Sequence, residues 1–221
     1  MHWALFFVFC LGIALRIYTA LKVEVWFDET ADLLTSLDNS FISLVTGDFS
    51  DPAHPPLYFI INKFISYLGY NIVWLRSLGV LTYLISFPLL LMFLKAILSK
   101  GSEVLVLLIL FGFSISQIFI GLGVVAQSYP YSILVSFSVL YFIHHFVFVK
   151  DKGLIKAELV FFALLGFVSF YLEYAIIWFY WSWVAFFFIG VLSRKIINKA
   201  QSRRLLWILF SSFLGASVWL P

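Results

Sequence analysis

The sequence has very little charge and a single cysteine. Lysine, arginine, aspartate and glutamate make up 11% of the 221 residues, whereas they make up roughly a quarter of a soluble domain. This scarcity excludes an ordinary soluble domain. Because Cys10 is the only cysteine, no internal disulfide can form, and its place within an apolar run indicates a packing residue. What is abundant is apolar: 63% of the residues are hydrophobic and 21% are aromatic.

Seven apolar runs predict an all-α, polytopic membrane protein that forms a single transmembrane domain over residues 1–221. A bilayer core needs roughly 20 residues of helix, and a helix pairs every backbone amide internally. The predicted spans are residues 3–21, 72–94, 103–121, 130–149, 157–173, 175–193 and 205–220. Only a short stretch around Glu173 separates the fifth span from the sixth, so a single broken or re-entrant element is the alternative.

The cations predict the sidedness of the chain. Ten of the fourteen lysines and arginines lie in the loops after the second, fourth and sixth predicted spans. The positive-inside rule then places these loops and the N-terminus in the cytoplasm and the first long loop outside. Because the cations are spread over short loops, they indicate topology rather than nucleic-acid binding. The short loops and the lack of a retention signal favour a bacterial plasma membrane.

The first external loop, residues 22–70, is the main polar segment of the chain. It holds seven of the eleven carboxylates: Glu24, Asp28, Glu29, Asp32, Asp38, Asp48 and Asp51. Charges beside a membrane are costly to hold unless they serve a function. We therefore expect the catalytic or binding site of the protein in this loop.

Short interfacial helices are predicted inside this loop. Asp28 is placed to cap a helix that begins at Glu29, and the apolar side of this helix comprises Ala31, Leu33, Leu34 and Leu37. A second helix follows from Phe41 and ends at Gly47. Residues 55–69 predict a third, which lies on the surface or tilts because Lys63 interrupts its apolar run.

Two adjacent carboxylates at the outer membrane boundary are the first candidate site. Adjacent residues of a helix diverge by about 100°, so Asp28 and Glu29 should have different tasks. We expect Asp28 to face a cavity as a general base, with Asp32 on the same face, and Glu29 to fix the loop. The alternative is that Asp28 only caps its helix.

His54 is the centre of the second candidate site. It lies between Asp51 and two prolines that fix the backbone, so its side chain has one direction. With Asp28 and Asp51 it would suit a divalent cation, or when protonated it would donate to a phosphate. An ordinary interfacial histidine is the alternative.

Three further ionisable residues lie near the outer ends of predicted spans. The forked donors of Arg76 suit a phosphate, and simple snorkelling to the interface is its alternative. For Arg16 we expect snorkelling. Glu173 is a site candidate by its depth, and otherwise part of a short external turn.

Several motifs together resemble a known group of enzymes. A first span is followed by W-F-D-E at 26–29, by H-P-P-L-Y-F at 54–59 and by W-L-R-S at 74–77. Weaker matches follow at A-Q-S-Y-P-Y, 126–131, and Y-L-E-Y, 171–174. This order resembles the N-terminal half of the dolichyl-phosphate-mannose–protein mannosyltransferase superfamily. Its members are polytopic C-type glycosyltransferases (GT-C fold), and bacterial relatives include aminoarabinose transferases.

The resemblance implies a membrane glycosyltransferase. The expected catalytic residues are Asp28, which matches the proposed catalytic base, and Glu29, its neighbour. His54 matches a position near the phosphate of the donor or a metal. The expected partners are a polyprenyl-phosphate-linked sugar, an acceptor protein, lipid or glycan, and membrane lipid, with no nucleic acid. No cofactor is certain, and a divalent cation on Asp28 and His54 is optional. The expected substrate-binding residues are Asp51, His54, Arg76, Tyr129 and Glu173.

Three departures from the family pattern accompany the resemblance. Tyr129 stands where many relatives have an arginine, and Glu173 where many have a histidine. Members of the family are also longer, with several more spans, so this chain is expected to be a fragment, a truncated product or a minimal relative. The alternatives to a glycosyltransferase are an inactive relative and a non-catalytic transporter, flippase or assembly subunit.

Overall fold

Every described element of the computed structural model is a helix. The structure describes residues 1–46, 55–67, 69, 72–98, 101–150, 153–172, 176–193 and 197–217. The first elements are α1 (His2–Lys22), α2 (Phe27–Asp38), α3 (Phe41–Thr46), α4 (Pro56–Ser66), α5 (Ile72–Ile97), α6 (Glu103–Ile115) and α7 (Gln117–Val124). They are followed by α8 (Tyr129–His144), the π-helical turn η1 (His145–Val149), α9 (Lys156–Leu172), α10 (Ile177–Ser193) and α11 (Lys199–Ser217). The all-α prediction is confirmed.

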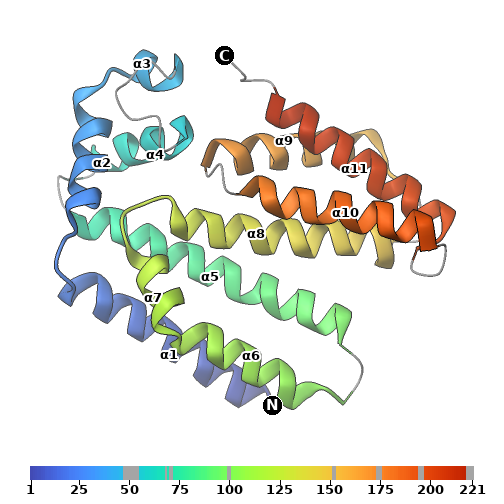
Figure 1. The fold of residues 1–221 in the computed structure, drawn as a ribbon. Helices are drawn as coiled ribbons and strands as arrows, with labels where there is room; N and C mark the ends of the chain where they lie inside the picture. The colour runs from blue at the N-terminus through green and yellow to red at the C-terminus, as the bar shows by residue number, and fades with distance from the viewer. Residues whose placement is uncertain are drawn as a thin grey trace.

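The long helices lie side by side, and the short helices α2, α3 and α4 gather at one end of the bundle (Figure 1). At the opposite end lie the end of α5 and the beginnings of α6 and α11. This arrangement separates the acidic segment around α2 from cations such as Lys95 and Lys199. It agrees with the alternation of charge along the sequence, while the membrane side that each end faces stays a prediction.

Two apolar cores hold the bundle together. One joins α1, α5 and α6 and includes Tyr83, Phe87 and Leu110. The other joins α4, α8, α9, α10 and α11. In the second core α9 and α11 approach backbone to backbone, because a Cβ at Gly215 would lie only 1.8 Å from the carbonyl oxygen of Ala163.

Three described helices are long and apolar enough to cross a membrane: α1, α5, and α8 together with η1. They correspond to the predicted spans 3–21, 72–94 and 130–149. α6 and α7 make a fourth crossing if the bent pair is counted as one span. The prediction of seven spans is not confirmed. α9 and α10 have 17 residues each, and α11 begins with several cations, so its apolar part is short.

The predicted span 103–121 is broken at Ser116, where α6 and α7 bend by 53°. Arg16 of α1 lies against this break and is only 1% exposed, so the expectation that it snorkels to the interface is wrong. Its guanidinium lies 3.8 Å from the ring centroid of Tyr83. It also donates to four backbone carbonyls at 3.1–3.4 Å, those of Gly12, Phe113, Ser114 and Phe119.

Many large apolar side chains on the bundle surface are exposed. On α1, Trp3, Phe6 and Phe7 are 85%, 61% and 65% exposed. An apolar surface of this kind is unfavourable in water and marks an interaction with lipid or protein. Together with the apolar helices, it is compatible with a membrane protein.

The helices of the acidic loop differ from the prediction in two ways. α2 begins at Phe27, not at Glu29, so Asp28 lies in the first turn and is not the cap. Its buried face is polar, formed by Glu29, Asp32 and Ser36, whereas Leu34 is 51% exposed. α3 follows as predicted, and its expected stop at Gly47 lies outside the described residues.

Candidate functional site

A buried ion pair joins α2 to α5. Nε of Arg76 donates to Oε1 of Glu29 at 3.0 Å, and Nη2 donates to Oε2 at 2.6 Å. The two side chains are 3% and 0% exposed. This two-point geometry is the strongest form of an arginine–carboxylate contact, so it fixes α2 against the bundle.

The remaining donors of Arg76 bind the chain just before α2. Nη1 donates to the carbonyls of Ala20 and Val23, at 3.3 and 2.8 Å, and Nη2 donates to the carbonyl of Glu24 at 3.0 Å. One carbonyl in the last turn of α1, that of Ala20, and two just beyond the helix are thereby bonded to a cation, which also interacts favourably with the helix dipole. Every guanidinium nitrogen of Arg76 therefore has an acceptor in the protein. The predicted phosphate contact would require one of these bonds to break.

Glu29 also accepts two backbone hydrogen bonds. The amide of Trp26 donates to Oε2 at 3.0 Å, which caps the first turn of α2, and the amide of Ala126 donates to Oε1 at 2.6 Å. Burial opposes ionisation of this carboxyl, but the hydrogen bonds and the charge of Arg76 outweigh it and lower the pKa of Glu29 below its usual value. Glu29 is thus an anion that ties down the loop, as the sequence predicts, and it is poorly suited to take up a proton.

Asp28 points away from this buried network. Its side chain is exposed, and among the described residues its carboxylate has no protein partner. The aromatic side chains before it, Trp26 and Phe27, are 52% and 84% exposed. The two adjacent carboxylates therefore have different surroundings, as expected: Glu29 is fixed inside the protein, and Asp28 is exposed. That Asp28 faces a cavity as a general base stays a prediction.

A second contact attaches α4 to the same place. The Tyr58 hydroxyl lies 3.0 Å from Oδ2 of Asp32 and 2.6 Å from the carbonyl oxygen of Ala126. Burial, followed by the charge of Asp32, raises the pKa of Tyr58 well above its usual value, so the hydroxyl keeps its proton. Ala126 is thus held through both its amide and its carbonyl. The segment that leads into α8 is docked on α2 and α4.

Lys63 completes the attachment of α2. Its Nζ donates to the carbonyls of Ser36, Leu37 and Asn39 at 3.2, 3.2 and 2.7 Å. A cation at the C-terminus of a helix satisfies the last carbonyls and interacts favourably with the dipole. One side of α4 is packed into the protein, because Tyr58 and Phe59 are fully enclosed. That α4 lies on the membrane surface or tilts stays a prediction.

Of the other predicted site residues, one lies in the described part of the chain. Tyr129 is 38% exposed at the start of α8, directly after the docked segment. Asp51, His54 and Glu173 lie outside the described residues. No group of three His, Cys, Asp or Glu side chains suited to a metal occurs in the part of the chain that is described. The predicted cation site on Asp28, Asp51 and His54 therefore stays a prediction.

Sequence reasoning missed four residues that build the site: Asp32 as a buried acceptor, Tyr58, Lys63 and Ala126. Tyr58 and Ala126 lie in two motifs of the resemblance, H-P-P-L-Y-F and A-Q-S-Y-P-Y, so those motifs meet in space. A comparison of the chain with protein-family models, curated proteins and solved structures finds no match to any of them.

Proposed function

We propose that this chain is a membrane glycosyltransferase that moves a sugar from a polyprenyl-phosphate donor to an acceptor hydroxyl. The observation that carries the proposal is the division of the carboxylate pair. Glu29 is held by hydrogen bonds from Arg76 and Ala126, and Asp28 is exposed next to it in the same turn of α2. A catalytic base needs a well-held position, since small displacements of a reacting group lower the rate steeply.

The surroundings of Asp28 suit a donor with an isoprenoid tail. Trp26 and Phe27 expose aromatic surface beside it, and Leu34 exposes apolar surface further along α2. Aromatic side chains are typical of the membrane–water boundary. A polar head at Asp28 and a tail in the lipid are compatible with this pattern, and a tail of many isoprene units explains why such an enzyme would be embedded in a membrane.

The reaction is a single displacement. The acceptor oxygen attacks the anomeric carbon, and Asp28 takes up the hydroxyl proton as the new C–O bond forms. The bond between the anomeric carbon and the phosphate oxygen breaks, and the lipid phosphate leaves with the electron pair. The configuration at the sugar carbon is inverted. Glu29 acts as a positioning residue, and His54 and Tyr129 are the proposed contacts of the phosphate.

The test uses membranes that contain the chain and a polyprenyl-phosphate mannose probe labelled in the sugar. With Asp28→Asn we expect transfer of label to fall by about 10²–10⁴-fold, as for loss of a general base, at unchanged abundance. The control is Glu24→Gln, which removes an exposed carboxylate four residues earlier and should leave transfer unchanged. Full activity of Asp28→Asn would remove Asp28 from this role.

Donor binding is tested separately with a photoreactive polyprenyl-phosphate mannose. We expect crosslinks within residues 22–76, retained in Asp28→Asn and competed by unlabelled donor. Crosslinks elsewhere, or none, would contradict the placement of the donor.

A second candidate is a non-catalytic transporter or assembly subunit. The bend between α6 and α7, with the buried cation Arg16 against it, favours this alternative. Broken spans and ionisable groups inside the bundle are typical of transporters. Solute flux in liposomes without binding of the lipid-linked sugar would favour it over the glycosyltransferase.

A further inference from the structure

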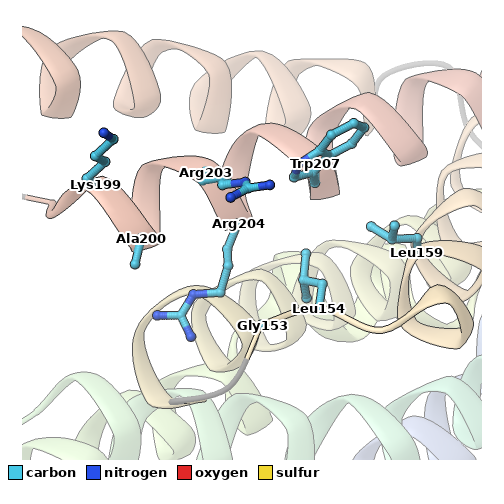
Figure 2. A pocket seen from close by; sticks show the side chains of 8 residues that line it. All are labelled: Gly153, Leu154, Leu159, Lys199, Ala200, Arg203, Arg204 and Trp207. Atoms are coloured by element: carbon cyan, nitrogen blue, oxygen red, sulfur yellow. The ribbon is translucent and has the colours of Figure 1, made fainter.

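We propose that a cavity at the opposite end of the bundle from Asp28 binds the phosphate headgroup of an anionic glycerophospholipid. The cavity has a volume of about 680 Å³ and lies between the beginning of α11 and the segment that leads into α9. Figure 2 shows its eight lining residues: Gly153, Leu154, Leu159, Lys199, Ala200, Arg203, Arg204 and Trp207. The proposal is independent of the glycosyltransferase function.

The cations of the cavity come from α11, where their spacing places them next to one another. Lys199, Arg203 and Trp207 recur every fourth residue, so they lie along one side of the helix. The Arg204 side chain extends from α11 toward Gly153 (Figure 2). None of the lining residues in the described part of the chain is acidic. This described lining therefore presents positive charge to a ligand.

Two of these cations are available to a ligand. Lys199 and Arg203 are exposed, and within the described part of the chain neither forms an ion pair. Lys150 at the same end of the bundle is different, because it is paired with Glu158. The planar guanidinium of Arg203 suits a phosphate in two-point geometry, and the ammonium of Lys199 adds a point charge.

Apolar surface lies next to the cations. It favours a phospholipid over a free phosphate as the ligand, because only the lipid has acyl chains to contact it. Leu154 and Leu159 line the cavity across from Trp207 (Figure 2). On the same side of α11 as Arg203, apolar surface is exposed by Trp207, Phe210 and Leu214, which are 45%, 57% and 56% exposed. The part of the helix from Arg203 to Leu214 is about 16 Å long at 1.5 Å per residue. This length accommodates much of an acyl chain, while the headgroup contacts Lys199 and Arg203.

The sequence places this end at the cytoplasmic face, where anionic lipids attract basic segments. Tryptophan is frequent at the boundary between headgroups and acyl chains. Trp207, which lies between the cations and Phe210, is at the position expected for such a boundary residue. Along α11 the side chains thus change from cationic to aromatic to apolar. A phospholipid has the matching order, from its anionic headgroup through the headgroup–acyl boundary to its acyl chains.

The experiment measures retention of phosphatidylglycerol and phosphatidylcholine by the purified full chain in mixed nanodiscs and by native mass spectrometry. We expect preference for phosphatidylglycerol, and a loss of about fivefold for each cation removed, which corresponds to roughly 1 kcal/mol for each basic residue. The test variant is Lys199→Gln with Arg203→Gln. Its control is Lys22→Gln with Lys95→Gln, which has the same net charge but leaves the cavity intact.

Two further measurements separate a lipid site from a phosphate site. Trp207→Ala should weaken phosphatidylglycerol binding without changing its dependence on salt, and soluble glycerol phosphate should compete poorly. Equal lipid preference in the test and control variants at matched helicity would overturn the proposal. Full competition by glycerol phosphate would also overturn it, because the ligand would then be a free phosphate.

Discussion

Glu29 and Arg76 lie 47 positions apart in the sequence and form a buried two-point ion pair. Neither residue could leave the other without stranding a charge in the interior, which is far more costly than losing an exposed pair. The pair also gathers the end of α1, the start of α2 and the segment at Ala126. The stability of the acidic loop therefore depends on it.

Replacing Glu29 should expose this dependence. We expect Glu29→Gln to lower the free energy of unfolding by about 3–5 kcal/mol, because Arg76 remains buried without its counter-ion. The measurement is thermal or detergent-induced unfolding of the purified protein. Asp28→Asn is the matched control, since its carboxylate is exposed and it should unfold like the parent protein. If both variants unfold alike, the pair does not stabilise the loop.

Acid should weaken the same contact. The pKa of Glu29 lies below the ordinary 4.5 of a glutamate, so ionised Glu29 stabilises the folded protein at pH values above 4.5. This contribution is lost as the pH falls below 4.5 through the lowered pKa. We expect the difference in melting temperature between the parent protein and Glu29→Gln to shrink over this range. A difference that is independent of pH would show that the ionised carboxylate is not its source.

The Tyr58 hydroxyl offers a test of how α4 is attached. Tyr58→Phe removes the partner of Asp32 and of the Ala126 carbonyl, and we expect a loss of about 1–3 kcal/mol. Protease protection of the α2–α4 region should fall with it. Tyr67→Phe is the control, because Tyr67 is 74% exposed. Unchanged protection in Tyr58→Phe would mean that packing alone holds α4.

Close packing of α9 on α11 predicts a contrast between two glycines. A Cβ at Gly215 would collide with the Ala163 carbonyl, whereas a Cβ at Gly112 would meet nothing within 4 Å. Gly215→Ala should therefore cost about 1–3 kcal/mol or more through overpacking. Gly112→Ala, also within a helix, should be neutral or stabilise by about 0.5–1 kcal/mol. Equal melting temperatures for the two variants would contradict this packing.

The lengths of apolar runs predict the long helices well. The expected spans 3–21, 72–94 and 130–149 correspond to α1 (His2–Lys22), α5 (Ile72–Ile97) and Tyr129–Val149. These boundaries are local properties, set by where charged and turn-forming residues interrupt the run. The break at Ser116 has a weak local signal, because Ser114, Ser116 and Gln117 interrupt the apolar run. Its other part is not local, because Arg16 from another helix bonds to the carbonyl of Ser114.

The acidic loop shows that apolar periodicity alone does not decide which side of a helix is buried. Periodicity along α2 places its apolar residues inside, yet Leu34 is exposed and Glu29 is buried. The buried carboxylate is stabilised by its contact with Arg76, which periodicity does not take into account. The division between Asp28 and Glu29 could be predicted from their spacing. The partners of Glu29 could not, because they are far away in the sequence.

The hydrogen bond from the Ala126 amide to Glu29 joins residues 97 positions apart, so its donor is synthesised much later than its acceptor. While the ribosome is still producing the helices in between, the carboxylate can already meet Arg76 but not its later backbone partner. Glu29 therefore lacks this second partner until residue 126 has been synthesised. Newly made chains should therefore pass through a protease-sensitive stage that ends when this late segment arrives.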